Sequence, residues 1–86
     1  MFLYIIKSDK LNRVYVGISN DVISRLKRHN ANAVKSTKNK GPWRIIYTEK
    51  CINLEQARLR EKYLKSYKGS LEKRKIINST TQSGVV

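Results

Sequence analysis

The sequence of 86 residues predicts an α+β fold, in which a three-stranded antiparallel sheet packs with two main helices and a short third helix. Three observations support this prediction. Two β-rich segments near the N-terminus are joined by a short polar stretch, as in a hairpin. Two later segments carry apolar residues at helical spacing after capping residues, and a β-rich segment separates them. The predicted order of elements is therefore β-β-α-β-α-α.

The hairpin is expected to pair Phe2–Ser8 with Val14–Ile18. Successive side chains of a strand point to opposite faces, so the apolar residues of the second strand share one face and leave Tyr15 and Gly17 on the other. A one-residue slip would reverse the faces of a strand. The register that keeps the apolar residues together places Tyr4 opposite or near Gly17. Tyr4 and Tyr15 then become diagonal neighbours on one face.

The first helix is expected to begin at Ser19-Asn20-Asp21, which carries capping side chains, and to run to about Asn30. Arg25 and His29 are four residues apart, so they lie on the same face of this helix. Arg25 could simply be a solvated cation of the helix. His29 could be a surface residue near the helix C-terminus, where a positive charge is favourable. The residues that we expect this helix to bury are Val22, Ile23 and Leu26.

The third strand is expected at Trp43–Glu49, with Ile45 and Tyr47 on one face. A second helix is expected to begin at Asn53, to continue to about Tyr67 and to stop before a glycine. Its predicted apolar stripe consists of Leu54, Ala57, Glu61 and Leu64.

Glu61 is unusual because it is a carboxylate within this stripe. It could form an ion pair with Lys65 one helical turn later, which would stabilise an exposed helix by about 0.3–0.5 kcal/mol. That pair does not explain its place between Ala57 and Leu64, where a carboxylate must either reach solvent at the edge of the stripe or have a partner such as a metal ion.

The C-terminal part is expected to form a short third helix, Leu71–Ile77, followed by a flexible tail over residues 79–86, so that the folded domain spans residues 1–78. Cys51 is the only cysteine and is expected to be a small buried residue. The sequence has neither an apolar run of membrane-spanning length nor the features of a signal peptide, which predicts a cytoplasmic domain without a membrane partner.

The net charge of +13, from 19 Lys and Arg residues against 6 acids, predicts a polyanionic partner. Seven cations and one acid lie between residues 20 and 44, where the predicted helix and loop adjoin the tyrosine face. Besides Arg25, the predicted phosphate contacts are Lys27, Arg28, Lys35, Lys38, Lys40 and Arg44.

Several motifs together resemble the GIY-YIG endonuclease family, in particular its small single-domain bacterial branch. They are Leu3-Tyr4-Ile5, Tyr15-Val16-Gly17, the helix with Arg25 and His29, Lys35-Ser36-Thr37-Lys38 leading to Pro42-Trp43, and Glu55-Gln56-Ala57 before Glu61. The resemblance extends from about residue 2 to residue 77. The first motif, Phe2-Leu3-Tyr4, lacks the glycine that names the family.

The resemblance implies an endonuclease that hydrolyses phosphodiester bonds in DNA rather than RNA, with structure- or strand-selective cleavage in DNA repair or processing as the expected role. It implies one Mg²⁺ or Mn²⁺ ion held by Glu61, and no small-molecule cofactor. Arg25 would hold a phosphate oxygen, and either Tyr4 or Tyr15 would be the general base. His29 would relay the proton or contact the phosphate, and Asn78 is a further candidate phosphate contact.

Two other classes of function remain to be compared with the nuclease. A non-catalytic DNA- or RNA-binding module on the same fold would also explain the charge of +13 and the altered first motif. A binder of anionic membranes would need a helix with a large apolar face and a basic opposite face, which the sequence lacks.

Overall fold

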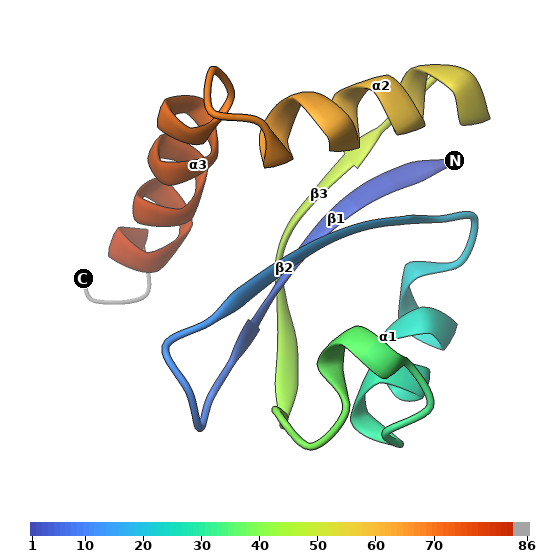
Figure 1. The fold of residues 1–86 in the computed structure, drawn as a ribbon, viewed down its shortest axis with the longest axis vertical. Helices are drawn as coiled ribbons and strands as arrows, with labels where there is room; N and C mark the ends of the chain where they lie inside the picture. The colour runs from blue at the N-terminus through green and yellow to red at the C-terminus, as the bar shows by residue number, and fades with distance from the viewer. Residues whose placement is uncertain (84–86) are drawn as a thin grey trace.

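The computed structural model describes residues 1–83, with side chains described through Ser79. Its elements are β1 (Phe2–Ser8), β2 (Val14–Ser19), α1 (Val22–Asn30), the 3₁₀ turn η1 (Lys35–Thr37), β3 (Trp43–Lys50), α2 (Leu54–Lys65) and α3 (Ser70–Ser83). The predicted α+β class and the order β-β-α-β-α-α are confirmed (Figure 1).

β1 is the central strand of an antiparallel sheet with the order β2-β1-β3. The residues Leu3–Ile6 are at most 1% exposed, because helices cover both faces of this strand. On one face Ile5 packs in a cluster with Leu64 of α2, and on the other Tyr4 packs in a cluster with Leu26 of α1. Figure 1 accordingly shows α2 and α3 on one side of the sheet and α1 on the other.

The predicted hairpin register is confirmed. Tyr4 pairs with Gly17, and Ile6 pairs with Tyr15, so the two tyrosines lie diagonally on one face. This face is the one that α1 covers.

The predicted face of Tyr47 is wrong, because β3 carries a bulge. Ile5 of β1 pairs with Tyr47, whereas the next residue, Ile6, pairs with Ile45. The extra residue, Ile46, shifts the alternation, so Ile45 lies on the α1 face and Tyr47 on the face of α2 and α3.

Two predicted apolar helix positions are exposed. Ile23 is 60% exposed, because the buried stripe of α1 runs along Val22, Leu26 and the fully buried His29. Leu54 is 41% exposed at the first residue of α2, where the helix has only begun to cross the sheet. The predicted cap of α2 is confirmed, since the Asn53 side chain accepts a hydrogen bond from the backbone of Gln56.

The two C-terminal helices differ in length from the prediction. α2 ends at Lys65 rather than Tyr67, because the Ser66 hydroxyl donates to the carbonyl of Tyr63 and accepts from the backbone of Gly69. α3 continues to Ser83, through most of the predicted tail, while residues 84–86 of that tail lie outside the described residues. No helix within residues 1–83 is long and apolar enough to cross a membrane.

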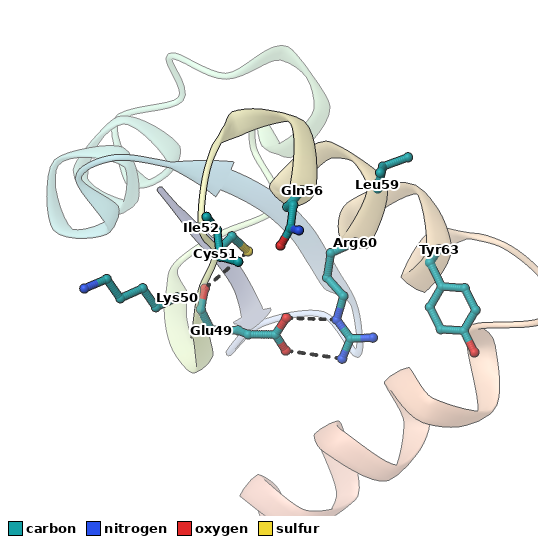
Figure 2. A pocket seen from close by; sticks show the side chains of 8 residues that line it. All are labelled: Glu49, Lys50, Cys51, Ile52, Gln56, Leu59, Arg60 and Tyr63. Carbon is teal, nitrogen blue, oxygen red and sulfur yellow. Dashed lines mark hydrogen bonds and ion pairs between the residues drawn. The ribbon is translucent and has the colours of Figure 1, made fainter.

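Arg60 joins α2 to both β3 and α3. Its guanidinium donates to the two carboxylate oxygens of Glu49 at 2.9 and 3.2 Å, as Figure 2 shows, and it also pairs with Glu72 of α3. The hydroxyl of Tyr47 donates to the same Glu49 carboxylate at 2.7 Å. These contacts limit the rotation of α2 on the sheet and thereby position the next residue, Glu61. The adjacent hollow of about 550 Å³ contains none of the predicted site residues.

Candidate active site

Three aromatic rings from three different elements meet on the α1 face of the sheet. The ring centroids of Tyr4 in β1 and Tyr15 in β2 are 6.4 Å apart. The His29 ring, in α1, lies 5.8 Å from the Tyr4 centroid and 5.1 Å from that of Tyr15. The predicted grouping of these three residues is therefore present in the structure.

Gly17 provides the space for the Tyr4 ring. A Cβ atom at position 17 would lie 2.5 Å from the Tyr4 hydroxyl oxygen and 2.6 Å from Tyr4 Cζ. Any other residue would therefore displace the ring or the strand. Glycine is required here for close approach, and its backbone φ is not in the left-handed region.

His29 links Tyr4 to Thr37 through two short hydrogen bonds. Its Nε2 lies 2.7 Å from the Tyr4 hydroxyl, and its Nδ1 lies 2.7 Å from Thr37 Oγ1. Thr37 Oγ1 donates its own proton to the carbonyl of Val34, so it accepts from Nδ1–H. This assignment leaves the lone pair of Nε2 to accept the Tyr4 hydroxyl proton.

The surroundings keep His29 neutral. Burial, followed by the positive charges of Arg25 and Arg28, lowers the pKa of His29 to about 4. Burial also raises the pKa of the Tyr4 phenol, and this effect outweighs the opposing hydrogen bond from Arg25. At neutral pH the pair is therefore a phenol donating to a neutral imidazole.

Arg25 lies one turn before His29 in α1 and faces the Tyr4 hydroxyl, whose pKa it lowers. Its Nε is buried, and among the described residues it has no hydrogen-bond partner. A buried donor without a partner is costly, by about 1–3 kcal/mol. Arg25 is therefore available to bind an anion brought by a ligand.

Glu61 lies on the side of α2 that faces this group. Its negative charge contributes to raising the pKa of Tyr4, and its side chain is 24% exposed. The predicted i,i+4 pair is present, with Lys65 Nζ 3.2 Å from Glu61 Oε2. The same Nζ lies 5.3 Å from the centroid of the Tyr15 ring.

The Glu61 carboxylate suits a hard divalent cation. The ammonium group of Lys65 already lies 3.2 Å from one of its oxygens. Within residues 1–83, no three His, Cys, Asp or Glu side chains form a metal-binding group. A carboxylate of this kind holds Mg²⁺ together with water and phosphate oxygens, whereas a structural zinc site requires four protein ligands.

The family described as the GIY-YIG catalytic domain matches residues 1–75, which include all the residues of this site. The chain belongs to the GIY-YIG family. It is also similar to a UPF0213 protein of Clostridium perfringens (strain 13 / Type A), at 35% identity over 65 residues that cover 74% of this chain and 69% of the relative. No solved structure matches it. GIY-YIG proteins are a nuclease family, which indicates a nucleic-acid substrate.

The basic residues predicted to contact nucleic acid fall into two groups in this GIY-YIG domain. Lys40 and Arg44 have partners within the chain, since Lys40 Nζ donates to the carbonyl of Ser36 and Arg44 forms an ion pair with Asp9 at 2.8 Å. The other four are exposed on α1, η1 and the following residue: Lys27, Arg28, Lys35 and Lys38. Asn78 is exposed on α3, and Cys51 is buried in the core as predicted.

Thr37 is the functional candidate that the sequence analysis missed. It is 1% exposed and holds the Nδ1 side of His29, although it follows His29 by 8 positions across the helix end and a loop. The Lys35-Ser36-Thr37-Lys38 motif was a signal for this segment, but it does not show which side chain turns inward. The indole of Trp43 fixes the segment by donating to the carbonyl of Thr37 at 3.3 Å.

Gly17→Ala should destabilise the domain by about 1–3 kcal/mol, because the new methyl group overlaps the Tyr4 ring. A double-mutant cycle with Tyr4→Leu, measured by chemical denaturation, isolates this contact. In the Tyr4→Leu background the same alanine should cost much less. An equal cost in both backgrounds would show that Gly17 does not make room for Tyr4.

The stability of the domain should fall as the pH decreases from 6.5 toward 4. The unfolded state protonates His29 near its ordinary pKa of 6.5, whereas the folded state does so only at about 4, so the unfolded state binds more protons in this window. The loss reaches about 3 kcal/mol at the lower end. Denaturation between pH 7.5 and 5, where carboxyl groups contribute little, measures the slope. A His29→Gln control should lack it, and an identical slope in that variant would assign the effect to other groups.

Proposed function

We propose that this chain is a metal-dependent endonuclease that hydrolyses phosphodiester bonds in DNA, with Tyr4, Tyr15, Arg25, His29 and Glu61 as its catalytic residues. The observation that carries the proposal is the hydrogen bond from the Tyr4 hydroxyl to a neutral His29, beside an arginine with a free buried donor. A binding module needs cations on its surface but has no use for a phenol–imidazole pair below them.

Tyr4 is the tyrosine that we propose as general base. Its proton has a defined acceptor, His29 Nε2, at 2.7 Å. Thr37 holds the tautomer of His29 that leaves this nitrogen free. Tyr15 is less buried than Tyr4 and lies beside it, where it can position the attacking water or a phosphate oxygen.

The proton transfer from Tyr4 to His29 is uphill but compatible with catalysis. An ordinary phenol pKa of about 10 and a His29 pKa of about 4 correspond to a free energy of about 8 kcal/mol for this transfer. Burial of Tyr4 adds to this cost, and the attraction between the phenolate and imidazolium charges reduces it. A turnover of 1 per second corresponds to a barrier of about 17 kcal/mol, so this step alone does not exceed it. The positive charge and hydrogen bond of Arg25 stabilise the phenolate and so oppose the cost of its burial.

Arg25 is proposed to bind the scissile phosphate. Its guanidinium can direct the unpaired Nε–H and neighbouring donors to phosphate oxygens, in a geometry that suits planar bidentate contacts. These donors lie next to the Tyr4 hydroxyl, so the phosphate and the attacking water would be held together. The charge that develops on the phosphoryl group in the transition state would strengthen the contact.

Glu61 is proposed to hold one Mg²⁺ or Mn²⁺ ion. When bound, such an ion would polarise the phosphoryl group and stabilise the leaving oxygen. The phosphates that flank the cleavage site would be contacted by four exposed cations, Lys27, Arg28, Lys35 and Lys38. Contacts to phosphates do not distinguish one base sequence from another. We therefore propose selection by the shape of branched, nicked or single-stranded DNA, in repair or processing in the cytoplasm.

Incubation with branched, nicked and single-stranded DNA, in Mg²⁺, Mn²⁺ or EDTA, tests this proposal. The protein should nick at least one substrate only when a divalent metal ion is present. Arg25→Ala and Glu61→Gln should each lower the rate by at least about 100-fold, because each removes a group that stabilises charge in the transition state.

Glu55→Gln is a matched control, because it neutralises an exposed acid of the same helix. It should cleave at the wild-type rate. Tight DNA binding without cleavage of any substrate would instead identify a non-catalytic module on this fold.

A further inference from the structure

Lys65 lies between the carboxylate proposed to hold the metal ion and one of the two site tyrosines. Its Nζ is 3.2 Å from Glu61 Oε2 and 5.3 Å from the centroid of the Tyr15 ring. Lys65 is the last residue of α2, one helical turn after Glu61. We propose that Lys65 competes with the divalent metal ion for Glu61, and that nucleic-acid phosphate removes this competition. The inference rests on the proposed metal site.

The ammonium group and a hydrated metal ion need the same space. A Mg²⁺ ion would lie about 2.0–2.1 Å from a carboxylate oxygen, with its waters beyond it. An ammonium group 3.2 Å from that oxygen occupies the volume of those waters. The two cations also repel each other, so Lys65 must leave before the ion can bind.

Lys65 can leave because it is weakly held. Its side chain is 47% exposed, and an exposed i,i+4 pair contributes little stability. Its contact with the Tyr15 ring is also weak at a solvent-accessible position. No other acid among the described residues pairs with it. The lysine is therefore a mobile cation on a flexible stem at the edge of the site.

A phosphate group of the substrate is a better partner for Lys65 than the Glu61 carboxylate, which the lysine would have to share with the metal ion. Once the lysine pairs with phosphate, Glu61 loses its cation and its full charge becomes available to the metal ion. Nucleic acid would thus raise metal affinity, and metal would raise nucleic-acid affinity by the same factor. This coupling would favour a loaded metal site when substrate is present.

Binding of Mn²⁺, followed by electron paramagnetic resonance in the Tyr4→Phe background to prevent hydrolysis, tests the competition without an activity assay. Lys65→Gln should bind Mn²⁺ about fivefold more tightly than the parent without DNA. Lys65→Arg, which keeps the charge, should bind as the parent does. Lys62→Gln, which removes an exposed charge from the same helix without a contact to Glu61, should also match the parent.

A short DNA duplex should increase Mn²⁺ affinity in the parent more than in Lys65→Gln, after subtraction of binding to the same duplex in Glu61→Gln. Equal affinities of the parent and Lys65→Gln, with binding that still depends on Glu61, would overturn the competition alone. Binding that is unchanged by Glu61→Gln in every protein would instead overturn the proposed metal site. Thermal unfolding of each variant confirms that the comparison is between folded proteins.

Discussion

The hydroxyl of Tyr4 can reach His29 only because position 17 of the neighbouring strand carries no side chain. The strand register aligns glycine with tyrosine, and the helix that follows β2 brings His29 over the opening. Thr37 then orients the imidazole from the other side. The site therefore depends on the close contact between Tyr4 and Gly17. A shift of the Tyr4 ring would break its hydrogen bond to His29 Nε2 and move its hydroxyl relative to Arg25.

The two faces of β1 contribute differently to the domain, one to its apolar core and the other to the candidate site. Leu3 and Ile5 pack against α2 and α3 in an apolar cluster that stabilises the domain. Tyr4, between them in sequence, points to the α1 face, where its hydroxyl joins His29 and Thr37 in a chain of hydrogen bonds beside the apolar side chains of Ile6 and Trp43. Such a network stabilises a fold only when every member has a partner. Within the part of the chain that the structure describes, the buried Nε of Arg25 has no partner, and this is where we propose that a phosphate binds.

The periods of strand and helix were sufficient to predict the grouping of Tyr4, Tyr15 and Gly17, and the common face of Arg25 and His29. Glu61 was identified because a carboxylate interrupted an apolar stripe. The loop contact of Thr37, the burial of His29 and the exposure of Ile23 depend on how the elements pack, which no local period determines. The β3 bulge reversed the face of Tyr47 for the same reason, since a single extra residue changes the register.

His29 is the only histidine in the chain, so ¹⁵N NMR observes its imidazole without ambiguity. The hydrogen bonds of His29 require a neutral ring at pH 7, with the proton on Nδ1 and the lone pair of Nε2 directed toward Tyr4. A pH titration should show this tautomer unchanged down to pH 5, with protonation centred at about 4. A ring that titrates near 6.5, or that carries its proton on Nε2 at pH 7, would contradict the account.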